Sequence, residues 1–130
     1  MRTAIIGTRT ANTKHYTQLC KMCDVLATLG GITEVISGGA SGADALAERY
    51  AKENGLKITV IPADWKTHGK AAGPMRNTEI IEACDQVVAL WDGKSTGTAD
   101  TIRKAKQAGK QVYILRYDET PKVGEQMTLF

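Results

Sequence analysis

Two glycine-rich turns are the stretches of this 130-residue chain whose residue types point most directly to chemistry. The first covers residues 37–42, Ser-Gly-Gly-Ala-Ser-Gly; an apolar run precedes it, and a helical pattern follows from Ala43. Glycine lets a backbone approach a ligand closely, and a turn that opens a helix directs free N–H groups at one point. The pattern therefore predicts a site for an anion such as phosphate. A tight strand-to-helix connection without a ligand is the alternative interpretation.

The second turn covers residues 92–98, Asp-Gly-Lys-Ser-Thr-Gly-Thr, and repeats this arrangement. The hydroxyls of both turns, on Ser37, Ser41, Ser95, Thr96 and Thr98, are suited to phosphate oxygens. The second turn contains Gly-Lys-Ser but lacks the GxxxxGK[ST] spacing of a P-loop, so we do not predict ATP hydrolysis. Together the two turns predict one phosphate-bearing ligand.

Arg76 and Asn77 follow Pro74, a residue that suits the first turn of a helix. An arginine there opposes the positive end of the helix dipole, and an anionic ligand would remove the conflict. Arg76 is therefore predicted to bind the ligand, with a solvated helix start as the alternative.

Asp64 and Trp65 follow the third apolar run, where the indole could stack on a base or pack at the sheet edge.

Three carboxylates lie beside these turns. Asp44 suits the dipole at the start of its own helix, and it could equally accept a sugar hydroxyl. Asp92 and Asp100 flank the second turn, and either could be a general base or a hydroxyl acceptor.

Cys20 and Cys23 have CxxC spacing, but they lie in mid-helix and no matching ligand pair completes a zinc set, so we expect them in the core.

The elements that position these residues follow from hydrophobic periodicity. Strands are predicted from short apolar runs at residues 3–7, 33–36, 56–61, 85–90 and 111–115. Helices are predicted at residues 15–29, at 43–54, from Pro74 onward, and from the second turn to Gly109, with a polar loop at 63–73. Continuous apolar strands alternating with helices indicate an α/β fold, a doubly wound parallel sheet of about five strands with helices on both faces. Right-handed crossovers place both turns at the same edge of this sheet.

Composition limits the classes of function. The net charge of +3 is too mild to support nonspecific DNA binding by itself, but it suits an anionic small ligand. No apolar run approaches the ~20 residues of a membrane span. The first residues enter a strand directly, so we expect no signal peptide, and three cysteines without a secretion signal favour reduced thiols. The expected location is the cytoplasm, or the host cytoplasm if the gene is viral.

Five ordered blocks resemble the YspA-like, YpsA-related branch of the SLOG superfamily. The blocks are residues 6–9 (Ile-Gly-Thr-Arg), 37–47, 62–65 (Pro-Ala-Asp-Trp), 72–77 (Ala-Gly-Pro-Met-Arg-Asn), and 91–93 with 97–98. This superfamily contains the lonely-guy phosphoribohydrolases and the DprA DNA-processing proteins. The resemblance implies a Rossmann-like nucleotide-binding domain, here over residues 1–116. It also implies a homo-oligomer, a dimer or larger, because related folds commonly pair through helices beside the site.

Lonely-guy enzymes cleave the N-glycosidic bond of nucleoside monophosphates. They use an arginine on the helix before strand four and a glutamate that follows a PGGxGTxxE turn. Arg76 resembles that arginine in position, whereas Thr101 stands where the glutamate would be. Asp100 is one residue early and is expected to point about 100° away on a helix. The resemblance therefore favours binding without hydrolysis, and Arg76, Asp100 and Asp92 are the catalytic candidates.

Residues 117–130 are predicted to form a C-terminal tail that ends in Gln-Met-Thr-Leu-Phe. This ending resembles the Gln-x-x-Leu-Phe peptide by which bacterial replication and repair proteins dock on the DNA polymerase sliding clamp. Gln126, Leu129 and Phe130 would then contact the clamp. The alternative is that the Leu-Phe pair folds back on the protein's own surface.

The leading hypothesis is a sensor or sequestering protein for a nucleotide or nucleotide-derived ligand, bound at the C-terminal edge of the sheet. The alternatives are a nucleoside 5'-monophosphate phosphoribohydrolase and a clamp-tethered accessory protein in DNA metabolism, whose small size is compatible with a phage origin. Arg9, Arg76 and Lys94 would neutralise the phosphate, and Trp65 or Trp91 would stack on the base. We predict no cofactor and no metal. The predicted ligand-binding residues are Gly7, Thr8, Arg9, Ser37, Gly38, Gly39, Ala40, Ser41, Gly42, Asp44, Asp64, Trp65, Arg76, Asn77, Trp91, Gly93, Lys94, Ser95, Thr96, Gly97 and Thr98.

Overall fold

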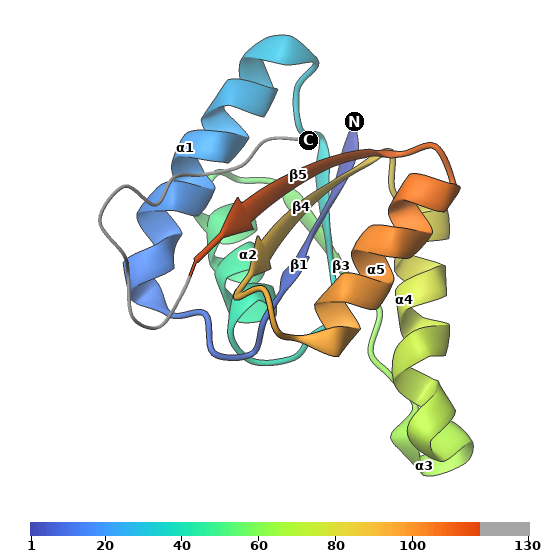
Figure 1. The fold of residues 1–130 in the computed structure, drawn as a ribbon. Helices are drawn as coiled ribbons and strands as arrows, with labels where there is room; N and C mark the ends of the chain where they lie inside the picture. Colours follow the sequence, from blue (N-terminus) through green and yellow to red (C-terminus); the bar gives the residue numbers. More distant parts are fainter. Residues whose placement is uncertain (118–130) are drawn as a thin grey trace.

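A parallel sheet of five strands forms the centre of the computed structural model, which describes residues 1–117 (Figure 1). The strands are β1 (Arg2–Gly7), β2 (Glu34–Ser37), β3 (Lys57–Val60), β4 (Gln86–Trp91) and β5 (Gln111–Arg116). Their order is β3-β2-β1-β4-β5, and every neighbouring pair is parallel. The order reverses between β1 and β4, and a doubly wound sheet opens a crevice at that point, beyond the carboxyl ends of its strands.

The helices cover both faces of this sheet, as predicted. Figure 1 shows α1 and α2 on one side and α4 and α5 on the other. Their bounds are Thr13–Leu29 for α1, Ala43–Glu53 for α2, Ala72–Ala83 for α4 and Thr96–Gln107 for α5. No helix within residues 1–117 is long and apolar enough to cross a lipid bilayer.

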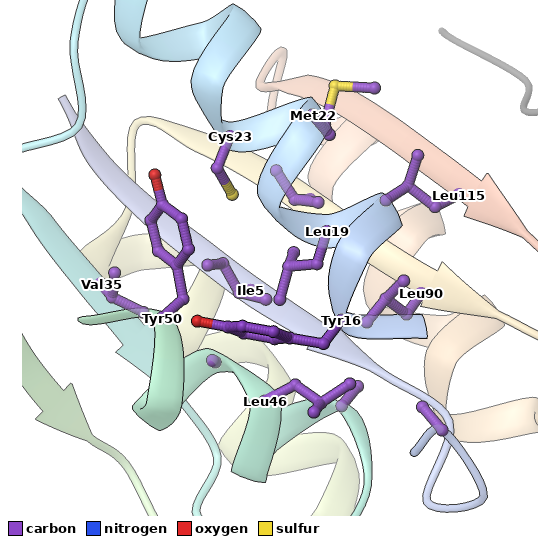
Figure 2. Close-up of a cluster of buried hydrophobic side chains, with 14 of the residues drawn as sticks. Ile5, Tyr16, Leu19, Met22, Cys23, Val35, Leu46, Tyr50, Leu90 and Leu115 are labelled. Atoms are coloured by element: carbon purple, nitrogen blue, oxygen red, sulfur yellow. The ribbon is translucent and has the colours of Figure 1, made fainter. Parts of the chain in front are cut away.

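Strands β1, β2, β4 and β5 each contribute to two separate cores because successive side chains point to opposite faces, whereas β3, at the edge of the sheet, buries none of its residues. Ile5 and Leu90 pack with Leu19 of α1 and Leu46 of α2 in one cluster (Figure 2). The second cluster lies under α4 and α5, and Ile6 belongs to it. Burial on both faces explains why the strands are continuous apolar runs rather than alternating ones. Among the three cysteines, which are all free, Cys23 is fully buried and Cys20 is partly buried against the first cluster, as expected.

The segment predicted as a polar loop contains helical structure instead. Its parts are α3 (Trp65–His68) and a 3-10 turn, η1 (Gly69–Ala71), and neither buries a residue. The Thr67 amide donates to the Asp64 carboxylate at 3.1 Å, so that Asp64 caps α3. Helix α3 is a single turn that begins at a side-chain cap, so it is too short to show a repeat of apolar residues. Hydrophobic periodicity therefore could not predict it.

Helix α4 begins at Ala72, two residues before the predicted start at Pro74. Proline is tolerated at this position because the first backbone N–H groups of a helix have no intrahelical acceptor. The N–H that Pro74 lacks therefore costs the helix no hydrogen bond. Arg76 and Asn77 therefore lie in the second turn of α4 rather than the first, which weakens the predicted conflict with the helix dipole. Leu29, the last residue of α1, is 72% exposed.

The connection between β1 and α1 is held at both ends. Asn12 caps α1, accepting from the Lys14 amide at 2.9 Å and donating its own amide to His15 Nδ1 at 3.0 Å. Burial, and then the charge of Lys14, lowers the pKa of His15, which favours the neutral ring that can accept this bond. The His15 ring packs on Tyr117, with 4.0 Å between ring centroids. These contacts position residues 8–10, which reach the site described next.

Candidate functional site

A cavity of about 560 Å³ opens where β1 and β4 end. This volume falls within the usual range for small-ligand pockets. Its walls come from the ends of β1, α2, α4 and α5, and from α3. The lining residues are Ile6, Gly7, Thr8, Arg9, Thr10, Ala40, Asp44, Trp65, Gly73, Pro74, Arg76, Asn77, Ile80, Ser95, Thr96, Gly97, Thr98, Asp100 and Thr101.

Arg76 and Asn77 join the two glycine turns across this cavity. Arg76 Nη1 donates to the Gly38 carbonyl at 2.9 Å, and Arg76 Nε donates to Asn77 Oδ1 at 3.2 Å. Asn77 Nδ2 then donates to the Gly97 carbonyl at 3.3 Å. This chain of hydrogen bonds, the Arg76–Asn77 clasp, runs from the first turn to the second. It sets the distance between the two turns.

Thr8, at the tip of β1, makes a second connection between the two turns. Its carbonyl accepts the Ala43 amide at 3.1 Å, and its hydroxyl accepts the Asp92 amide at 3.2 Å. Gly42 packs directly on this tip, where a Cβ would lie 2.4 Å from the Arg9 carbonyl oxygen. Gly42 also has a φ of +71°, which glycine adopts without strain. The first turn therefore uses Gly42 to bring α2 against β1.

Some backbone amides of the first turn already donate to side chains nearby in the sequence. The Gly39 amide donates to Ser37 Oγ at 3.2 Å, and the Ala40 amide donates to Asp44 Oδ2 at 3.1 Å. We expected the phosphate on the amides of residues 38–42 and 97–98, and these two bonds use part of that set. They stabilise the backbone shape of the turn.

The second turn divides its amides between an internal carboxylate and the cavity. Asp92 Oδ1 accepts the amides of Lys94 and Ser95, each at 2.8 Å. No acceptor within residues 1–117 reaches the amides of Thr96 and Gly97, at the start of α5. Both residues line the cavity. Two anion donors are therefore available at the N-terminus of α5, where the helix dipole also favours negative charge.

The cavity carboxylates Asp44 and Asp100 lie in contrasting environments. Burial raises the pKa of Asp44 and outweighs the Ala40 amide and the Arg76 charge. Burial also raises the pKa of Asp100, but the hydrogen bonds from Lys104, Asn77 and Arg103 outweigh it and bring the pKa below its usual value. Lys104 Nζ lies 2.9 Å from Asp100 Oδ2, and Arg103 Nη2 lies 2.6 Å from Oδ1. Asp100 is thus held ionised.

Asp92, the third carboxylate beside the turns, lies outside the cavity lining. Burial raises its pKa, but the amides of Ser95 and Lys94 outweigh this effect and lower it overall. Its described contacts hold the second turn in shape.

The two tryptophans, both predicted to contact a base, lie in different places. Trp65 lines the cavity and is 50% exposed, with its ring against Gly73. Trp91 does not line it: its Nε1 donates to the Ser95 carbonyl at 3.1 Å, and its ring faces a separate groove between α5 and β5. Arg116 lies over that ring, with 5.9 Å from Cζ to the ring centroid. Trp65 is therefore the aromatic side chain available in the cavity.

The cavity lining includes more than half of the residues predicted to bind the ligand. The predicted residues outside it are Ser37, Gly38, Gly39, Ser41, Gly42, Asp64, Trp91, Gly93 and Lys94. The lining also includes residues that no pattern suggested as ligand contacts, namely Ile6, Thr10, Gly73, Pro74 and Ile80. Gly73 and Pro74 belong to a block that carries the family resemblance, so that block was an available signal. Ile6 belongs to another such block, residues 6–9, whereas Ile80 looks like any core residue in the sequence.

Asp100 and Thr101 both line the cavity, although successive residues on a helix point about 100° apart. Asn77 Nδ2 donates to Asp100 Oδ2 at 3.2 Å and holds that side chain toward the site. Thr101 occupies the position where the resemblance would place a glutamate. Its hydroxyl donates to the Gly97 carbonyl at 3.1 Å.

A doubly wound parallel sheet with a cavity at its switch point defines a Rossmann-like protein, and its architecture fits a ligand-binding role. The model of the YspA, cpYpsA-related SLOG family matches residues 1–68, and the chain belongs to this family. The Gene 61 protein of Mycobacterium phage D29 is 38% identical, over 67% of this chain and 73% of that protein.

Solved structures of other proteins share the fold. DNA processing protein A (DprA) from Streptococcus pneumoniae superimposes with a TM-score of 0.72 at 20% identity, over 95% of this chain. This chain spans about half of that protein, 52% of its length. The molybdenum cofactor binding protein from Rippkaea orientalis superimposes with a TM-score of 0.66 at 20% identity, over 90% of this chain and 77% of that one. At these identities the likeness establishes the fold alone.

Proposed function

We propose that this protein binds a nucleotide or nucleotide-derived ligand in the cavity and acts as a sensor or a sequestering protein. The observation that carries the proposal is the composition of one 560 Å³ space. It brings together the open amides at the start of α5, the guanidinium of Arg76 and the exposed indole of Trp65. An anion site, a cation and a stacking surface are the parts that a nucleotide requires.

In this proposal the phosphate binds at Thr96 and Gly97, because these amides have no acceptor within residues 1–117. Arg76 uses Nη1 and Nε in the clasp, which leaves Nη2 for the phosphate. Arg9 lines the same cavity and adds a second positive charge. Lys94 lies outside the lining and is not needed for this arrangement. The base stacks on Trp65.

Binding without hydrolysis is favoured over the phosphoribohydrolase alternative. Of the two carboxylates considered as catalytic partners of Arg76, Asp92 lies outside the cavity lining. Asp100 lies in it, but Lys104, Arg103 and Asn77 already occupy both of its oxygens. A general acid needs a raised pKa, whereas the pKa of Asp100 is lowered. Its three donors also leave only about one of four acceptor positions for attack on a substrate.

Trp65 fluorescence tests the proposed function. The chain contains two tryptophans, so Trp91→Phe leaves Trp65 as the reporter in the cavity. Titration with AMP, GMP or CMP is expected to change its emission saturably for at least one nucleotide, because stacking alters the indole environment. In protein that retains Trp91, Trp65→Ala is expected to weaken binding about five- to hundredfold by calorimetry.

Two outcomes would contradict this proposal. Absence of binding by all three nucleotides, in protein that is folded by circular dichroism, would argue against a nucleotide site. Release of free base from the same mixtures, measured by liquid chromatography, would replace the binding protein with a hydrolase.

A second proposal concerns the C-terminal peptide. Gln126, Leu129 and Phe130 lie outside the described residues, so this proposal depends on the sequence resemblance to clamp-binding peptides. We propose that the peptide docks on a DNA polymerase sliding clamp, independently of the cavity. Deletion of residues 126–130 is expected to abolish retention on an immobilised bacterial clamp and to leave the Trp65 titration unchanged. Retention of the truncated protein would refute it.

A further inference from the structure

The carboxylate of Asp44 is buried beside the cavity with an incomplete set of protein donors. Asp44 is 6% exposed and lines the cavity wall. The Ala40 amide donates to Oδ2 at 3.1 Å, and the Gly38 amide also donates toward the carboxylate. A carboxylate offers about four acceptor positions, so these two backbone donors leave acceptor capacity on a residue that lines the cavity. Burying a carboxylate is costly unless its acceptor positions are used.

Capping explains only part of this arrangement. Asp44 lies in the first turn of α2, where a negative charge is favourable. That role is available to an exposed carboxylate, and it does not require a side chain facing a cavity. A Cβ on Gly38 would lie 2.9 Å from Asp44 Oδ2 and 2.4 Å from Arg76 Nη1. Because Gly38 has no side chain, the carboxylate of Asp44 and the guanidinium of Arg76 can both reach the same wall of the cavity.

The cavity limits what can donate to Asp44. Arg9 and Arg76 line the same space, whereas the carboxylate Asp100 in that lining is already paired with Arg103 and Lys104, so a cationic group on the ligand would meet two like charges. Neutral hydroxyl donors complete the carboxylate without that repulsion. The clasp connects Gly38, beside Asp44, to Gly97, at the anion donors. A ligand that spans the clasp therefore carries its anion at one end and hydroxyl groups nearer to Asp44.

We propose that Asp44 accepts hydrogen bonds from the ribose hydroxyls of the ligand and makes the site selective for ribonucleotides over deoxyribonucleotides. This inference rests on the proposed function, since it assigns the sugar of the same nucleotide. Removing one hydroxyl from the ligand leaves the buried carboxylate with an unused acceptor position, and a hydrogen bond to a charged group contributes more than a neutral one. The sugar is thus recognised through the carboxylate of Asp44, the phosphate binds at the start of α5, and the base stacks on Trp65.

Calorimetric titration of the full chain with matched nucleotides tests this selectivity. The probes are AMP and GMP, each with its 2'-deoxy and 3'-deoxy counterparts. We expect the wild-type protein to bind the ribonucleotide about ten- to hundredfold more tightly than at least one deoxy counterpart. In Asp44→Asn the ratio is expected to fall below about threefold, because the amide has lost the charge. Asp24→Asn, the same change at an exposed position of α1, is the matched control and is expected to keep the wild-type ratio.

Each other outcome is decisive. Equal binding of ribo and deoxy nucleotides by the wild-type protein would overturn the role of Asp44 and leave the proposed function standing. Binding of none of these nucleotides would overturn both. An unchanged ratio in folded Asp44→Asn would assign the selectivity to another residue. If Asp44→Asn does not fold, the comparison of ligands on the wild-type protein still decides, because it changes only the sugar.

Discussion

Arg76→Ala is expected to weaken nucleotide binding at least about thirtyfold, a loss of about 2 kcal/mol or more. The change removes a guanidinium that lines the cavity, and it also breaks the clasp at the Gly38 carbonyl. Arg76→Lys is expected to recover only part of the affinity, since an ammonium cannot bond Gly38, Asn77 and a phosphate with one planar fork. Calorimetric titration with the nucleotide that binds best measures both effects.

Arg49→Ala is the control for this prediction. Arg49 lies on α2, where its side chain contacts the Tyr16 ring and Glu53 and is absent from the cavity lining. Its removal is expected to leave nucleotide affinity unchanged. Arg76→Ala protein that is folded and binds with wild-type affinity would show that the ligand does not occupy this cavity.

Gly42→Ala is expected to destabilise the fold by about 3 kcal/mol or more. The new Cβ would lie 2.4 Å from the Arg9 carbonyl oxygen and 2.5 Å from that of Thr8, and the backbone has a φ of +71° and a ψ of −123°. L-residues rarely adopt this conformation, and neither carbonyl can move without disturbing β1 or its connection to α1. Urea denaturation followed by circular dichroism measures the change.

Gly97→Ala provides the contrast. Gly97 lies in the first turn of α5, and a Cβ there meets nothing within 4 Å. Alanine in a helix is favoured over glycine by about 0.5–1 kcal/mol, so this variant is expected to be as stable as the wild type or slightly more stable. The same urea midpoint for both variants would refute the proposed packing of Gly42 on the tip of β1.

These two glycines also distinguish the two turns, which are similar in sequence. Gly42 has a packing role between α2 and β1, and Ser37 and Asp44 accept amides of the first turn. In the second turn Asp92 accepts two amides, while Thr96 and Gly97, whose amides have no acceptor within residues 1–117, line the cavity. The first turn thus contributes mainly the Asp44 carboxylate and the Gly38 carbonyl, and the second contributes the anion donors.

The amino-acid sequence by itself determined the fold class and the edge of the sheet that carries the cavity. Runs such as Val87–Leu90 are apolar at every position because both faces of β4 are covered, and such runs alternating with helices specify a parallel α/β sheet. Parallel strands with right-handed crossovers then place every strand-to-helix turn at one edge. Both consequences follow from local pattern and chain chirality, so no tertiary contact was needed to predict them.

The tertiary structure alone decided which donors and acceptors in those turns remain available to a ligand. Arg76 bonds the carbonyl of Gly38, which is 38 residues away in the chain, and Asn77 holds Asp100 toward the cavity. Trp65 lines the cavity because α3 forms, whereas Trp91 faces the other side of α5. A residue type shows only what a side chain can donate or accept. Whether that capacity is already used depends on neighbours from other elements, which become adjacent only when the chain folds.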